Sequence, residues 1–156
     1  MKGNEKLIQA LNGLLADELT AINQYVVHAE MAEKWGYGKL KKTVGTRSIT
    51  EMKHAEKLIE RILFLEGTPN VGVLNKINIG ADVSQQCAND LASEMITVGS
   101  YNSAVKLATD VGDNATEEIL EGILQDEDGH VSEIEENLNQ IKQMGIQNFL
   151  ANQTGE

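Results

Sequence analysis

Apolar residues recur at steps of three or four positions along four long stretches of the chain, the spacing of one face of an α-helix. Gly36, Gly67, Gly112 and Gly145 fall at or just after the ends of these stretches, where glycine commonly ends a helix. A shorter apolar pattern after Gly145 predicts one more helix, which is too short to be stable unless it docks on another element. The predicted helices run at about residues 4–35, 39–66, 83–111, 114–144 and 146–153.

The connections between these helices predict how they are arranged. Short turns after the first and third helices require antiparallel neighbours, whereas about sixteen residues separate the second helix from the third. An extended segment of that length reaches about 50 Å, enough to run along a helix of about 40 Å. Helices two and three can therefore run parallel, with the connection packed along the bundle as a strap. We expect an all-α, ferritin-like four-helix bundle with one long crossover, a short C-terminal fifth helix and a single domain over residues 1–156.

Charge and cysteine content narrow the partners and the compartment. The formal net charge is −11, and no basic arm or stripe is visible, so we expect no nucleic-acid partner. Cys87 is the only cysteine, which excludes an intrachain disulfide and suits a reducing compartment. The first residues lack the apolar core of a signal peptide, and no uncharged run approaches the ~18 residues of a membrane span. These features predict a cytoplasmic protein with no membrane partner.

Each long helix carries a glutamate in the middle of the stripe that should be apolar, and two helices add a histidine one turn later. Residues three apart lie on one helix face, so each resulting Glu-x-x-His motif can point both side chains at one place in the interior. Four buried carboxylates cannot remain without partners, because burial and mutual repulsion both oppose their charge. We therefore predict a two-metal site. Its residues are Glu18, Glu51, His54, Glu94, Glu127 and His130.

A single Glu-x-x-His motif on a helix is usually part of a solvated face. The prediction of a metal site therefore depends on the residues of all four helices taken together. One glutamate from each of two helices and Glu-x-x-His from each of the other two is the ligand set of di-iron carboxylate bundles. Carboxylate and imidazole donors suit iron or manganese better than structural zinc, which usually takes thiolates. Four carboxylates balance the charge of two divalent ions. The donors leave iron and manganese open, and the match to the di-iron bundle template favours two iron ions per subunit.

Over essentially its whole length the chain resembles a bacterioferritin subunit. The resemblance rests on five blocks, Asp17–Tyr25, Glu51–Glu56, Ile59–Gly67, Asp126–His130 and Met144–Leu150. Members of that family form hollow shells of 24 subunits, oxidise ferrous iron at a di-iron centre within each subunit, and store ferric mineral inside. The resemblance, rather than the periodicity, therefore implies a homo-oligomer built from two-fold dimers. It leaves room for a second type of ferritin subunit and for a ferredoxin-like electron donor.

The resemblance also assigns roles to individual residues. Tyr25 resembles the family's aromatic neighbour that can pass an electron to the centre, and the alternative is an ordinary core tyrosine. The chemical logic of the centre is that hard oxygen donors favour Fe³⁺ over Fe²⁺, while two irons share the electrons that O₂ or peroxide requires. The implied iron ligands are Glu51 and Glu127 as bridges, Glu18 and Glu94 as terminal carboxylates, and His54 and His130 on one ion each.

Met52 is the candidate for a second cofactor. It follows Glu51 on the predicted helix and points about 100° away from it, off the core and onto the flank of the subunit. Leu19, Ile22 and Val26 offer an apolar strip on the first helix there. In bacterioferritins this flank meets its two-fold mate, and a methionine from each subunit ligates one haem b, because an isologous contact supplies both ligands from one residue. The alternative is an ordinary apolar dimer contact.

The leading hypothesis is thus a ferroxidase, an Fe(II):oxygen oxidoreductase, that stores iron and takes part in iron homeostasis, with haem assisting iron release. A haem-free ferritin or a co-subunit of a mixed shell is the nearest alternative. A rubrerythrin-like di-iron peroxidase shares the helical motif, but that class commonly adds paired Cys-x-x-Cys motifs, which Cys87 alone cannot supply. A non-catalytic interaction module would not explain glutamates in the core of all four helices.

Overall fold

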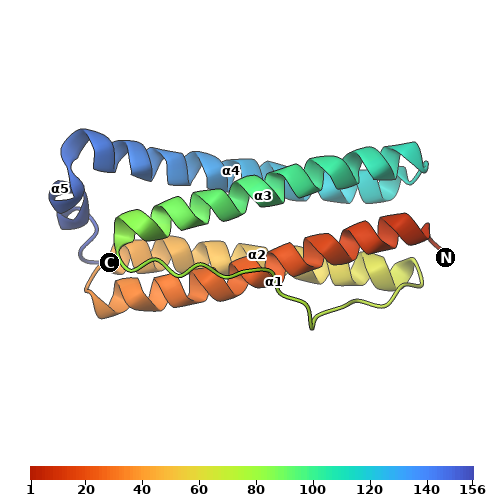
Figure 1. Ribbon diagram of the computed structural model, residues 1–156, viewed down its shortest axis with the longest axis horizontal. Helices are drawn as coiled ribbons and strands as arrows, with labels where there is room; N and C mark the ends of the chain where they lie inside the picture. Colours follow the sequence, from red (N-terminus) through yellow and green to blue (C-terminus); the bar gives the residue numbers. More distant parts are fainter.

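The computed structural model describes residues 1 to 156, and its only regular secondary structure is α-helix (Figure 1). Four long helices form a bundle and a short fifth helix lies at its end, which confirms the predicted fold class. None of these helices carries an apolar stretch sufficient to cross a bilayer. The helices are α1 (Glu5–Lys34), α2 (Gly38–Phe64), α3 (Val83–Asp110), α4 (Asn114–Met144) and α5 (Ile146–Ala151).

The helix ends follow local capping chemistry. Asn4, Asp82 and Asp113 precede α1, α3 and α4, and each side chain accepts a hydrogen bond from a first-turn backbone N–H of its helix. The second helix ends two residues before the predicted position 66, because Glu66 takes a positive φ of 61° and the Gly67 N–H bonds back to the Ile62 carbonyl.

The long helices pack as two antiparallel hairpins. α1 lies along α2 and α3 lies along α4, while α1 and α3 join the hairpins to each other. α2 and α4 touch over only a short length. The interior is therefore closed on the side of α1 and α3, and it is more open between α2 and α4.

Residues 65–82 form the crossover, which returns along the bundle so that α2 and α3 run parallel (Figure 1). Its backbone N–H groups donate to side chains of α1 spaced one turn apart. Asn75 donates to the Thr20 hydroxyl at 2.8 Å, Asn78 to the side-chain oxygen of Gln24 at 3.1 Å, and Gly80 to His28 Nε2 at 3.0 Å. The segment is thus a strap held by side chains, as predicted, and not a strand.

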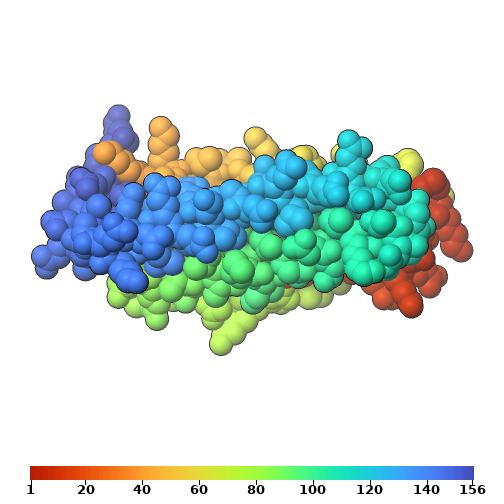
Figure 2. All heavy atoms as spheres, turned by 90° about the horizontal axis from the view of Figure 1, so that it is seen from above, coloured from red at the N-terminus to blue at the C-terminus, as the bar shows by residue number.

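Two apolar clusters fill the bundle. The larger one contains Leu7, Leu11 and Leu14 of α1, with residues from the other three long helices. The smaller one includes Leu40, Ile134 and Phe149, so α5 docks through its one fully buried side chain. Figure 2 shows α5 covering the end of the bundle opposite the N-terminus. The glutamates of the apolar stripes belong to neither cluster and form a polar layer in the middle of the bundle.

Candidate metal centre

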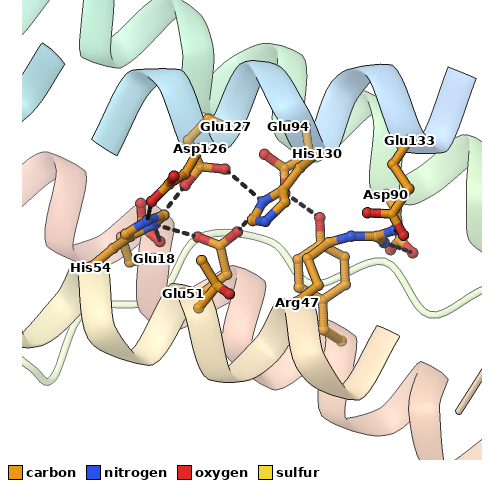
Figure 3. A network of polar contacts seen from close by, with 12 residues as sticks. Glu18, Arg47, Glu51, His54, Asp90, Glu94, Asp126, Glu127, His130 and Glu133 are labelled. Carbon is orange, nitrogen blue, oxygen red and sulfur yellow. Dashed lines mark hydrogen bonds and ion pairs between the residues drawn. The ribbon is translucent and has the colours of Figure 1, made fainter. Parts of the chain in front are cut away.

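The six predicted ligands meet in this polar layer (Figure 3). Five of them are at most 2% exposed, and His130 is 12% exposed on the side where α2 and α4 diverge. The first helix supplies Glu18, α2 supplies Glu51 and His54, α3 supplies Glu94, and α4 supplies Glu127 and His130.

These side chains form two overlapping groups of four. Within each group one ligand atom per residue lies within 4.8 Å of all the others, the separation expected of atoms around one cation. Glu51 and Glu127 belong to both groups, so their carboxylates lie between two adjacent metal positions. The first group is Glu18, Glu51, His54 and Glu127, and the second is Glu51, Glu94, Glu127 and His130.

Both imidazole rings turn the same nitrogen toward the carboxylates. His54 Nδ1 lies 3.0 Å from Glu127 and 3.2 Å from Glu51. His130 Nδ1 lies 3.2 Å from Glu127 and 2.8 Å from Glu51. In each group, therefore, one imidazole nitrogen is available to a metal and the Nε2 atom faces outward.

Two tyrosines orient the remaining two carboxylates. Tyr25 on α1 donates a hydrogen bond to Glu94 on α3, and Tyr101 on α3 donates to Glu18 on α1 at 2.7 Å. Both rings are at most 1% exposed, and burial together with the adjacent carboxylate raises the pKa of each phenol well above its usual value. The hydroxyls therefore keep their protons and hold the carboxylates in place. The prediction placed Tyr25 beside the centre, where it lies, and missed Tyr101.

A constant offset along the chain relates the two halves of the centre. Glu94, Tyr101, Glu127 and His130 each lie 76 positions after a residue of the same type, namely Glu18, Tyr25, Glu51 and His54. The α1–α2 hairpin and the α3–α4 hairpin therefore supply equivalent side chains. This offset is the sequence signal that identifies Tyr101 once Tyr25 is known.

The carboxylates do not all carry their usual charge in the metal-free protein. Burial raises the pKa of Glu18 well above its normal value, and nearby Glu51 adds to the rise. Burial raises the pKa of Glu94 to about 7, opposed by His130 and assisted by Glu127. Burial also disfavours ionised Glu51, but the adjacent side chains of Glu18, His130 and His54 outweigh that effect and lower its pKa to about 2.

The pKa values of the two histidines shift in the direction opposite to the one that burial alone would cause. Burial lowers the pKa of His130, but contacts with Glu127, Glu51 and Glu94 outweigh it and raise the pKa to about 11. The same balance raises the pKa of His54 far above its usual value. Without metal, protons on these groups therefore supply the positive charge that the carboxylates need.

The arrangement of these carboxylates and histidines is better suited to binding metal cations than to holding protons alone. Glu18 Oε2, Glu51 Oε1 and Glu94 Oε2 are buried without any hydrogen bond, although an ionised carboxylate normally accepts several. The Glu51 atom lies close to His130 Nδ1, but that contact lacks the alignment of a hydrogen bond. Unsatisfied carboxylate oxygens from three helices, distributed over the two groups, form an oxygen-rich donor set of the kind that iron and manganese accept.

Further charged residues, which were not among the predicted site residues, lie around these six. Asp126 Oδ2 lies 2.9 Å from His54 Nε2. Arg47 is 3% exposed, with its guanidinium 5.1 Å above the centre of the Tyr25 ring and ion pairs of 3.9 Å to Asp90 and 3.4 Å to Glu133. Arg47 and Asp90 lie four positions before Glu51 and Glu94 on their helices, so the same helical spacing is the signal that could have indicated their burial.

Met52, the candidate haem ligand, lies apart from the metal cluster. Its side chain is 45% exposed on α2, as the predicted angle from Glu51 requires. Ile49, one turn earlier on the same helix, and Val26 on α1 are also exposed apolar residues. The thioether is thus accessible from outside the subunit.

Comparison with known proteins identifies the family. A family model described as a ferritin-like domain matches residues 8–144. A curated relative, a bacterioferritin of Rhodobacter capsulatus, is 42% identical over 149 residues, which covers 96% of this chain and 92% of that protein. The chain belongs to the bacterioferritin family.

Other relatives match the chain over nearly their full length as well. A bacterioferritin of Brucella melitensis is 36% identical over 96% of this chain and 92% of its own length. A protein named bacterial ferritin from Paramagnetospirillum magnetotacticum is 36% identical over all of this chain and 96% of its own length. The similarity therefore includes all four helices that supply the cluster.

Proposed function

We propose that this bacterioferritin subunit binds two ferrous ions as substrate at the six-residue cluster and oxidises them to ferric iron for storage. The observation that carries the proposal is the pair of overlapping four-residue groups that share Glu51 and Glu127. Two ions held by shared carboxylates lie close enough to deliver two electrons to one acceptor. A single-metal site would need neither the second histidine nor the sharing.

The chain's own residues account for binding and for the direction of the reaction. Glu51 and Glu127 would bridge the ions, Glu18 and Glu94 would each hold one end, and the Nδ1 atoms of the two histidines would complete the set. Carboxylate oxygens stabilise Fe³⁺ more than Fe²⁺, so the site favours electron loss. Two Fe²⁺ each give one electron, and O₂ takes up both electrons with two protons to form hydrogen peroxide. Peroxide as the oxidant takes up two electrons and two protons to form two waters.

Ferric iron produced in this way would be stored as mineral inside a shell of identical subunits. The shell of 24 built from two-fold dimers is part of the proposal, and family membership supports it. A second kind of subunit in the shell and a ferredoxin-like electron donor for iron release remain compatible with it.

Met52 would serve as the axial ligand of a haem shared between two subunits. The site fits, because the thioether is accessible on α2 and Ile49, one turn earlier on that helix, is also an exposed apolar residue. Haem bound there would supply a path for electrons that reduce stored iron to Fe²⁺. Offering haem to the wild type and to Met52→Leu tests this part, since only the wild type should develop the absorption of bis-methionine haem.

The decisive experiment for the centre compares Glu127→Ala with Glu121→Ala, an exposed glutamate of the same helix. Rapid mixing of metal-free protein with Fe²⁺ and O₂ should give fast formation of ferric absorbance in the wild type and in Glu121→Ala. Glu127→Ala should lose the fast phase and keep its assembled size by light scattering. Unchanged early kinetics in an assembled Glu127→Ala protein would refute the proposed centre.

A further inference from the structure

The two halves of the cluster differ at the outward nitrogen of each histidine. His54 Nε2 lies 2.9 Å from Asp126 Oδ2, whereas no hydrogen bond or ion pair engages His130 Nε2 (Figure 3). Both histidines turn Nδ1 inward, so the difference lies entirely behind the rings. A carboxylate behind a ligating imidazole fixes its tautomer and orientation and raises its basicity, which is typically worth 10- to 100-fold in metal affinity.

The internal offset of 76 positions identifies the residue that breaks the equivalence. Asp126 precedes Glu127 on α4, and the equivalent residue before Glu51 on α2 is Thr50. The hydroxyl of Thr50 donates to the Thr46 carbonyl of its own helix at 3.2 Å. Thr50 and His130 line the same polar groove of about 310 Å³, and the one carboxylate in that groove, that of Glu133, pairs with Arg47 at 3.4 Å.

A second difference between the two halves, a buried positive charge near Glu94, also disfavours a metal ion on that side. The buried guanidinium of Arg47 lies over the ring of Tyr25, whose hydroxyl is bonded to Glu94. The residue 76 positions later is Ile123, which is fully buried and uncharged. A positive charge near Glu94 opposes a cation on that side, although the ion pairs of Arg47 with Asp90 and Glu133 reduce the effect. Nothing comparable acts at Glu18.

We propose that the two metal positions are unequal, and that Asp126 makes the position of Glu18 and His54 the tighter one. The position of Glu94 and His130 is the weaker one. This inference rests on the proposed function, because it concerns the same two positions. It makes Asp126 a positioning residue that acts through His54.

The test measures each position by itself, because two adjacent cations repel each other and would give stepwise binding even in a symmetric centre. His130→Ala leaves the first position with its histidine, and His54→Ala leaves the second. Binding of Co²⁺ to each assembled, metal-free variant is followed by calorimetry and by the visible absorption of the bound ion. The His130→Ala protein should bind Co²⁺ about 10- to 100-fold more tightly than the His54→Ala protein.

Two further substitutions, each with a matched control, assign the difference to its cause. Added to His130→Ala, Asp126→Ala should weaken Co²⁺ binding about 10- to 100-fold, whereas Asp128→Ala, which removes an exposed carboxylate from the same turn, should leave it unchanged. Added to His54→Ala, Thr50→Asp should strengthen binding by a similar factor. Thr43→Asp adds the same charge to the same groove two turns away and should have little effect.

The outcomes separate this inference from the proposed function. Failure of the wild type to bind Co²⁺ would remove the metal centre itself. Two positions of equal affinity would leave the centre in place and overturn the inequality. If Asp126→Ala and Thr50→Asp change the Co²⁺ affinity no more than their controls do, then charge in general, and not the carboxylate behind the histidine, sets the affinity. That result too would overturn the inference.

Discussion

Replacing Glu94 by glutamine should make the metal-free protein more stable, and increasingly so as the pH rises. Glu94 is 2% exposed, and burial raises its pKa from 4.5 to about 7. Each unit of pKa corresponds to about 1.4 kcal/mol, so the full effect is about 3 kcal/mol. Because the pKa in the folded state is the higher one, this stability is present below pH 4.5 and is lost as the pH rises through 7. Glutamine does not titrate and can still accept the hydrogen bond from Tyr25.

Guanidinium unfolding of chelator-treated protein, followed by circular dichroism at pH 5 and pH 8, measures the effect. Wild type and Glu94→Gln should differ little at pH 5, and the variant should be more stable by about 3 kcal/mol at pH 8. The exposed Glu121→Gln should match the wild type at both values. Adding Co²⁺ should reverse the order, because only the wild type keeps both metal positions and gains stability from binding. A gap of equal size at both pH values would refute the argument that ionisation of a buried Glu94 destabilises the fold.

Three further outcomes follow from the same contacts. Binding of two Co²⁺ at pH 6.5 should release about two or more protons per subunit, since the raised pKa values leave both histidines protonated until metal displaces the protons. Calorimetry in buffers of different ionisation enthalpy counts the released protons. Release of none would contradict the protonation described. Tyr101→Phe removes the 2.7 Å bond to Glu18 and should lower the free energy of unfolding by about 1–2 kcal/mol, with no loss expected if that bond is unimportant. Phe149→Ala empties the only fully buried site of α5 and should cost about 3–5 kcal/mol, with faster hydrogen exchange in α5 than in α1.

The helices and the six convergent side chains could be predicted because both depend on periodicity within single helices. A glutamate in an apolar stripe, as at Glu18, must face the interior wherever the partner helices lie. The helix ends moved by one or two residues where caps such as Glu66, with its positive φ, override the stripe. Metal binding by the six residues remains a prediction.

Contacts that depend on how one helix is placed against another could not be predicted. Whether Asp126 reaches His54 depends on the relative height of α2 and α4. Burial of Arg47 depends on Tyr25, Asp90 and Glu133, which come from three other helices. No single stripe records such combinations, so the sequence does not show which partners neutralise these charges.

The path of the strap is determined largely by side chains of α1 rather than by its own side chains. Three of its hydrogen bonds run from backbone N–H groups to Thr20, Gln24 and His28 of α1, and the Asn75 side chain adds a fourth, to Asp17 Oδ1 at 2.6 Å. The side chain of Asn12, also on α1, bonds to the backbone of the strap at Thr68 and Asn70. Most side chains from Asn70 to Ile79 are exposed on the subunit. Within a subunit, most side chains of the crossover can therefore change without loss of these bonds. Asn75, which donates to Asp17, and Gly80, where a Cβ would clash with the Gln86 backbone nitrogen, are exceptions. A change on that one face of α1, by contrast, would remove bonds that hold the route.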